Sequence, residues 1–168
     1  NGISEFSSIS ADGRYVAFAC LASNLVPGDT NGDWDVFVHD RQTGATTRVS
    51  VDSAGNQADE TSYSTAISAD GRFVAFHSDP TNLVAGDDNA LSDVFVRDRT
   101  LGTTERVSVD SAEAQAAGGG SLDPSISADG HFVFLKRHRG LFKRLLHEMC
   151  VLFQRSSSPR HCERSEAI

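Results

Sequence analysis

The stretch SISADGRYVAF at Ser8–Phe18 occurs three times in the chain, with small changes. It returns as AISADGRFVAF at Ala66–Phe76 and as SISADGHFVF at Ser125–Phe134. When the sequence is shifted by 58 residues, residues 9–58 match residues 67–116 at 32 of 50 positions. A fixed period of tens of residues is typical of solenoids and propellers, in which each repeat is one supersecondary unit.

Each repeat is expected to form four short antiparallel strands. An Asp-Gly pair between two apolar runs marks a tight hairpin, because Gly accepts a positive φ. One strand therefore precedes the turn and a second follows it, over residues 14–20 and 72–78. The third strand is DVFVHD or DVFVRD, and the fourth is TTRVSV or TERVSV, whose alternation indicates a half-exposed outer strand.

These patterns predict an all-β fold built from stacked four-stranded blades. The second strands, RYVAFAC and RFVAFHS, are apolar almost throughout, as expected for sheets covered on both faces. Two complete blades are expected at about residues 5–53 and 63–111, and a partial third blade from residue 122. Residues 1–134 thus form the repeat domain, and residues 135–168 form a tail outside it.

The repeat resembles the TolB-like β-propeller repeat, a relative of the WD-type repeats. The resemblance lies in SADGRxVAF followed by DVFVxDRxxGxxxRVS and covers about residues 5–134. The unit is longer than the roughly 40 to 45 residues of a WD-type blade. The resemblance implies a propeller of several blades that serves mainly as a rigid binding or scaffold module. It also implies an extracytoplasmic location, in the periplasm or outside the cell.

The charge of the chain changes abruptly after Phe134. Residues 1–134 contain seven Arg, no Lys and twenty Asp and Glu, whereas residues 135–168 contain eight Lys and Arg and three Glu. The acidic part argues against nucleic-acid binding, because phosphates would be repelled. The closing SSSPRHCERSEAI resembles the translation of a bacterial repetitive element. We therefore interpret residues 135–168 as the product of a frameshift or insertion.

The tail also contains a candidate helix. Apolar residues between Leu141 and Phe153 recur at helical spacing, opposite basic residues. As a basic amphipathic helix, this segment would contact a membrane surface or a groove of a partner protein. The alternative is a helical or disordered tail without a role. The three Cys residues form no CxxC pair, so neither a zinc site nor a disulfide framework is predicted.

The loop sequence GDTNGDWD, at Gly28–Asp35, is a candidate calcium site. Oxygen ligands stand at alternate positions, as a hard cation favours; they are Asp29, Asn31, Asp33 and Asp35. The second copy reads GDDNALSD and has Leu91 in place of Asp33. The alternative is that these side chains bond to nearby backbone and shape the loop, which is common for Asp and Asn.

Other candidate residues are weaker. Trp34 stands where the second copy has Ser92, so it either contacts a ligand at the loop tip or packs on its own loop, the interpretation we favour. Arg48 and Arg106 either bind an anionic partner or, as we favour, keep the outer strand soluble. The six His residues show no repeated ligand spacing, so they predict no metal site.

Three functional hypotheses follow. No GxSxG, HExxH or phosphate-binding glycine loop is present, so we expect a non-enzymatic module that binds a protein partner. Alternatively, the blades belong to a propeller-containing hydrolase or lyase whose catalytic part lies elsewhere, or the chain is a truncated reading frame with no function. Because an incomplete ring leaves apolar blade faces uncovered, we also expect self-association through those faces.

Overall fold

The computed structural model describes residues 2–79, 81–110, 112, 114–115, 119–137 and 148–152. Within these residues the regular elements are all strands. They are β1 (Ser4–Ile9), β2 (Tyr15–Cys20), β3 (Asp35–Asp40), β4 (Thr46–Arg48), β5 (Ser62–Ile67), β6 (Phe73–Ser78), β7 (Asp93–Asp98), β8 (Thr103–Arg106), β9 (Ser121–Ile126), β10 (Val133–Arg137) and β11 (Glu148–Leu152).

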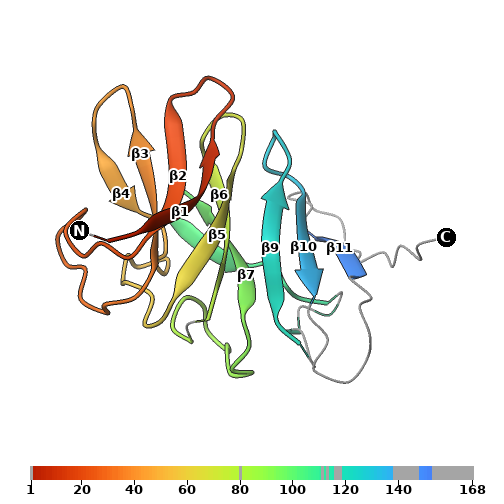
Figure 1. Ribbon diagram of the computed structural model, residues 1–168. Helices are drawn as coiled ribbons and strands as arrows, with labels where there is room; N and C mark the ends of the chain where they lie inside the picture. Colours follow the sequence, from red (N-terminus) through yellow and green to blue (C-terminus); the bar gives the residue numbers. More distant parts are fainter. Residues whose placement is uncertain are drawn as a thin grey trace.

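The strands form three antiparallel sheets that follow one another along the chain. The first sheet is β1-β2-β3-β4, the second is β5-β6-β7-β8, and the third is β9-β10-β11. Figure 1 shows them standing face to face, with β5 between β1 and β9, which it contacts on either side. The all-β prediction and the four strands of each complete repeat are confirmed.

The Asp-Gly hairpin between the first two strands is held by its own side chains. Ser10 donates from its hydroxyl to the Asp12 carboxylate (2.6 Å), which also accepts from the amide of Arg14 (2.9 Å). The Ser10 hydroxyl accepts from the amide of Tyr15 (2.9 Å). Gly13 has a φ of 70°, which favours glycine. The same bonds recur in both later copies.

The first strand of every sheet contains an irregularity that the sequence did not predict. Phe6, Ser64 and Asp123 occupy equivalent positions and all have a positive φ, of 51°, 54° and 48°. In each sheet the pairing between the first and second strands changes register, at or next to this position. A bulge bends the strand and re-aims its side chains.

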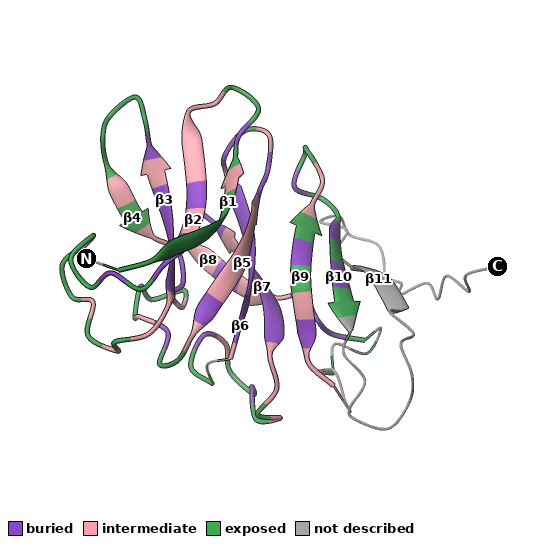
Figure 2. Ribbon diagram, viewed as in Figure 1, coloured by how far each residue is buried: buried purple, intermediate pink, exposed green. Residues whose placement is uncertain are grey.

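The apolar core lies between the sheets, as predicted. Alternate residues of β6 point to opposite sides: Val74 and Phe76 pack against the first sheet, whereas Phe73 and Ala75 pack against the third. All six residues of β6 are buried. Figure 2 shows buried residues concentrated in this middle sheet, whereas much of β1 is exposed.

The outer strand is half-exposed as expected but shorter. β4 ends at Arg48 because the amides of Val49 and Ser50 both bond to one carbonyl, that of Val36 (2.8 and 3.4 Å). Val51 then pairs with Gln57 in an isolated bridge. The chain is thereby turned so that Gln57 approaches the loop before β3.

The third sheet differs from the sequence prediction at its C-terminal end. β10 continues to Arg137, beyond the expected domain boundary at residue 134, and β11 pairs with it from Val133–Leu152 to Arg137–Glu148. The predicted helix over 141–153 is wrong for residues 148–152, because their backbone pairs with the edge that β10 offers. The rest of that predicted helix lies outside the described residues. Across the described ranges the structure has no helix that could span a membrane.

Candidate functional site

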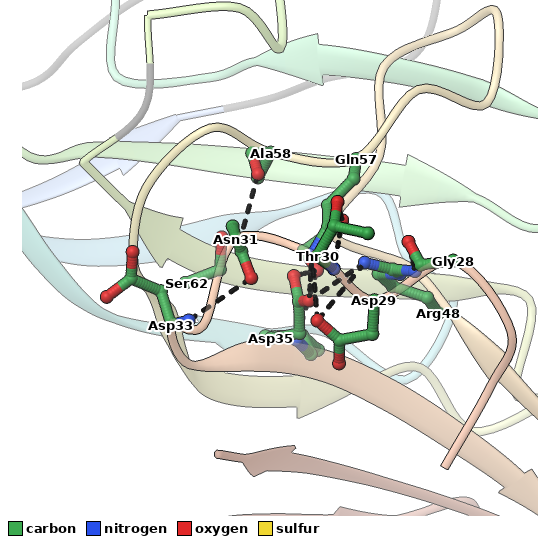
Figure 3. A network of polar contacts seen from close by, with 12 residues as sticks. Gly28, Asp29, Thr30, Asn31, Asp33, Asp35, Arg48, Gln57, Ala58 and Ser62 are labelled. Carbon is green, nitrogen blue, oxygen red and sulfur yellow. Dashed lines mark hydrogen bonds and ion pairs between the residues drawn. The ribbon is translucent and has the colours of Figure 1, made fainter. Parts of the chain in front are cut away.

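Arg48 lies at the centre of the loop that was predicted to bind calcium (Figure 3). Its Nη1 is 3.0 Å from Asp35 Oδ2 and 3.8 Å from Asp29 Oδ1, and its Nη2 donates to the carbonyl of Gly28 (2.9 Å). The Arg48 side chain is only 9% exposed. The interpretation of Arg48 as a solubilising residue of the outer strand is therefore wrong, because the side chain turns inward to two carboxylates.

Asp35 is the most deeply buried carboxylate of this network. It is fully buried and accepts hydrogen bonds from the Ser50 hydroxyl (2.6 Å) and from Gln57 Nε2 (2.8 Å). Burial raises the pKa of Asp35, while the bonds from Ser50 and the charge of Arg48 oppose this rise. Gln57 Nε2 also donates to Asp29 (3.1 Å). We call Asp29, Asp35, Arg48 and Gln57 the loop clamp.

The other two predicted calcium ligands point elsewhere. Asn31 donates to the carbonyl of Ala58 (3.1 Å), and its own carbonyl oxygen accepts from the amide of Asp33 (3.1 Å). The Asp33 carboxylate accepts from the Thr61 hydroxyl (3.4 Å). These are the local bonds of the alternative interpretation, and they tie the loop to residues 58–61.

The four predicted ligands therefore do not converge on one point. The described part of the chain contains no group of three or more His, Cys, Asp or Glu placed to hold a metal ion. The position between Asp29 and Asp35 that a cation would take is filled by the guanidinium of Arg48. The donor set thus does not fit calcium in this geometry, and calcium binding stays a prediction for solution measurement.

The second repeat contains a clamp of the same residue types, in which the Gln side chain accepts a hydrogen bond from the Arg. Arg106 Nη1 lies 3.1 Å from Asp87 and 3.6 Å from Asp93, and it donates to Gln115 (2.8 Å). Arg106 is again 9% exposed, so its solubility interpretation is also wrong. Burial raises the pKa of Asp87. Since Leu91 replaces Asp33 here without loss of the clamp, the clamp does not depend on that carboxylate.

One further ion pair in each repeat connects the start of the second strand with the end of the third strand. Arg14 makes two bonds to Asp40 (3.0 and 2.7 Å), and Arg72 makes the same two bonds to Asp98 (3.0 and 2.8 Å). The Arg14 guanidinium holds the pKa of the Asp40 carboxyl well below its usual range. The Asp40 carboxylate also accepts from the amide of Gln42 (2.9 Å), so it closes the β3–β4 turn.

Trp34 and His39 both contact a neighbouring strand. Trp34 is half-buried, and its carbonyl accepts from the amide of Ser62 (2.7 Å), at the join to the next repeat. His39 Nδ1 lies 3.0 Å from the Thr46 hydroxyl. In the second repeat Arg97 makes the same contact to the hydroxyl of Thr104 (3.0 Å). The contact therefore joins the third and fourth strands in both repeats.

His77 is a buried group that sequence reasoning passed over. It is 3% exposed and meets the ring of Tyr63 edge-on, with 4.1 Å between centroids. Neither ring nitrogen has a hydrogen-bond partner in the described part of the chain. Burial lowers the pKa of His77, against the opposing charges of Asp79 and Asp123. The signal was available, because the first repeat has Ala19 at this position.

A cleft of about 440 Å³ lies between the second and third sheets. The Ser92 hydroxyl donates to Asp79 (2.5 Å) at its wall. Each lining residue from the second repeat differs from the residue 58 positions earlier, although the repeats are largely identical. The lining consists of Glu60, Asp79, Thr81, Ala90, Leu91, Ser92, Gly120 and Leu122. The side chains that the second repeat contributes to the cleft are therefore particular to that repeat.

No protein-family model matches the chain, and no curated protein matches its sequence. A protein assigned as TolB from Agrobacterium tumefaciens superposes with a TM-score of 0.58 at 17% identity, over 95% of this chain and 48% of its own. The fold is that of a β-propeller.

Propellers of peptidases are similar as well. The acylaminoacyl peptidase of Pyrococcus horikoshii has a TM-score of 0.55 at 12% identity and is covered over 24% of its length by 94% of this chain. The propeller domain of the Trilobed protease from Pyrococcus furiosus has a TM-score of 0.50 at 10% identity, with 98% of this chain on 58% of that domain. This chain spans about half the length of the TolB protein that it matches.

Proposed function

We propose that this chain is part of a TolB-like propeller that acts as a non-enzymatic, rigid module for protein binding outside the cytoplasm. The observation that carries the proposal is the division between repeated and unrepeated residues. The loop clamp and the hairpin ion pairs occur in both repeats and bond to the chain itself. The residues of the cleft occur once, so they are the part free to recognise a partner.

The chemistry of the cleft defines the partner that it would take. Glu60 and Asp79 are acidic, whereas Leu91 and Leu122 are apolar. A peptide segment with a Lys or Arg next to an apolar residue would match both features. The similarity to TolB supports this proposal and the extracytoplasmic location, which fractionation of the native cell would test.

A peptide array tests the proposal. The purified chain should bind peptides in which Lys or Arg adjoins an apolar residue, and Glu60→Gln should weaken this binding about fivefold. Glu5→Gln, at an exposed residue of β1, is the matched control and should bind like the parent. Binding that ignores peptide charge, or equal binding by both variants, would overturn the proposal.

The same array addresses the alternative of a hydrolase or lyase. That alternative is favoured by the similarity to the acylaminoacyl peptidase, of which this chain covers only 24%. A non-enzymatic module leaves the masses of the peptides unchanged. Cleaved peptides, or a native protein whose mass includes a further catalytic domain, would favour the enzyme. Absence of the protein from its native cell would favour a reading frame without function.

A further inference from the structure

The first and second sheets each place an aromatic ring on the Asp-Gly turn of the next sheet. The ring of Tyr15 covers Gly71 so closely that a Cβ there would lie 2.1 Å from Tyr15 Cδ2. Phe73 covers Gly130 in the same way, again with 2.1 Å to Phe73 Cδ2. Only glycine fits beneath either ring, so this contact is a built feature of the joint between sheets.

A backbone hydrogen bond accompanies each of these contacts. The amide of Ala11 donates to the carbonyl of Ala69 (3.0 Å), and the amide of Ala69 donates to the carbonyl of Ala128 (2.9 Å). In both contacts between neighbouring sheets, the turn of the earlier sheet therefore donates the bond and the turn of the later sheet accepts it. A further joint would use the amide of Ala128 as donor.

The third sheet carries the aromatic residue of the joint without a turn beneath it. Phe132 is the counterpart of Tyr15 and Phe73, and it is 41% exposed where Phe73 is 6% exposed. Phe134 is 37% exposed. Val133, between them, is fully buried against the second sheet. The outer face of the third sheet thus presents two Phe rings, and Phe132 stands in the position that covers a turn in the other two sheets.

The first sheet carries the turn without an aromatic ring above it. A Cβ on Gly13 would have only the Arg41 guanidinium (3.7 Å) and the Ile9 side chain (4.0 Å) nearby. Ile9 is 55% exposed, whereas its counterpart Ile67 is 8% exposed. The outer face of the first sheet therefore has the surface that receives a ring in the other two sheets.

Arg41 is already in the position that its counterpart takes in a complete joint. Arg41 Nη1 donates to the carbonyl of Gly13 (2.9 Å), as Arg99 Nη1 donates to the carbonyl of Gly71 (2.6 Å). The Arg99 guanidinium also lies over the ring of Tyr15, 4.6 Å from its centroid. A ring placed over Gly13 would stack on Arg41 in the same way.

We propose that the third sheet of one copy docks on the first sheet of a second copy, with Phe132 over Gly13 and Arg41. The partner is a second copy because the exposed surface of the first sheet has the same residues as the surface that receives a ring within the chain. Gly13 matches Gly71, and Arg41 matches Arg99. The contact is head to tail, so a ring forms if the rotation closes. The chain matches 58% of the Trilobed propeller domain, so two copies have about the size of one propeller.

This inference does not use the cleft of the proposed function, and its test has a different readout. Sedimentation of the full chain over a range of concentrations should show a species of twice 18.0 kDa. Phe132→Asp and Ile9→Asp should each weaken dimerisation at least about tenfold, because each places a charge in one apolar contact. Arg41→Ala, at an exposed residue of the β3–β4 turn that donates to Gly13, should weaken it less.

Mixing the two Asp variants gives the decisive result. A Phe132→Asp copy keeps a normal first sheet, and an Ile9→Asp copy keeps a normal third sheet, so their mixture should dimerise although neither does alone. Leu101→Asp, at a 65% exposed residue in the β7–β8 turn, is the control and should dimerise like the parent. Circular dichroism shows whether each variant is folded.

Two results would overturn the proposal. One is a chain that stays at 18.0 kDa up to its limit of solubility. The other is a dimer that is lost in Phe132→Asp but kept in Ile9→Asp, because this would place third sheet on third sheet. Peptide binding by the cleft can succeed or fail in either case.

Discussion

The first and second repeats have largely the same sequence and yet differ in burial. β6 is buried along its whole length, whereas half of β2 is only partly buried. Ile67 is 8% exposed and Ile9, its counterpart, is 55% exposed. The second sheet has a neighbour on both faces and the first has one on a single face. Burial in this fold is thus set by the neighbouring sheet and not by the repeat.

The polar contacts follow the opposite rule. The loop clamp has the same residue types in both repeats, with Arg48 and Arg106 equally buried. The hairpin ion pairs also have nearly identical distances. These contacts lie within one repeat and need no neighbour. The apolar core therefore lies between the repeats, whereas these ion pairs shape each repeat from within.

The largest effect expected from this contrast concerns Phe76 and its counterpart Phe18. Phe76→Ala should lower the free energy of unfolding by about 3–5 kcal/mol, because it empties a fully buried site. Phe18→Ala should cost less than about half of this, because Phe18 is only partly buried. Urea unfolding of both variants at equal, low protein concentration measures the difference. Equal losses would show that the repeat itself sets burial.

The loop clamp should give the same loss in both repeats. Arg48→Met and Arg106→Met each leave a buried carboxylate without its cation, so each should cost about 3 kcal/mol. Arg14→Met, which removes a more exposed ion pair, is the control and should cost less. Urea unfolding is again the measurement. A large difference between the two clamp variants would mean that the clamp depends on a neighbouring sheet.

His77 should make the stability of the chain depend on pH. The first repeat has no such group, because Ala19 stands at the equivalent position. Burial lowers its pKa in the folded state, so the unfolded chain takes up the proton first. The Tm should therefore fall as the pH drops below about 6.5, the ordinary value for His. Asp79 and Asp123 face this ring and moderate the effect, and Tyr63 packs on it.

The variant His77→Phe separates this group from the others. Phe keeps a ring against Tyr63 but cannot be protonated, so the fall in Tm between pH 7 and pH 5 should become shallower. His131→Gln, at an exposed residue, is the control and should keep the parent profile. A His77→Phe profile identical to that of the parent would exclude His77 as the cause.

The sequence predicted the features that depend on local spacing. The Asp-Gly turns, the four strands of each repeat and the burial of DVFV all follow from a short pattern written twice. It did not predict that Arg48 turns inward, because alternation in TTRVSV indicates an exposed side chain. The clue was the joint repetition of Asp35, Arg48 and Gln57 at constant spacing. A pair of residues 13 positions apart is brought together by the β3–β4 hairpin, which a linear pattern does not reveal.

The C-terminal end shows a second limit of the sequence. Helical spacing between residues 141 and 153 predicted a helix, yet Glu148–Leu152 form a strand. The spacing describes one segment alone, whereas β10 offers a complete row of backbone partners to any segment that reaches it. Tertiary pairing therefore overrides a local preference.

Calcium should have the smallest effect, and the first repeat is where to measure it. Because the Arg48 guanidinium already lies between Asp29 and Asp35, where a cation would bind, millimolar calcium should leave the Tm of the parent chain unchanged. In Arg48→Ala the same two carboxylates lose their cation, and calcium should then raise the Tm. Arg106→Ala tests the second repeat in the same way. A rise in the parent chain would instead support the calcium site predicted at Asp29–Asp35, since it would require the carboxylates to bind calcium in preference to Arg48.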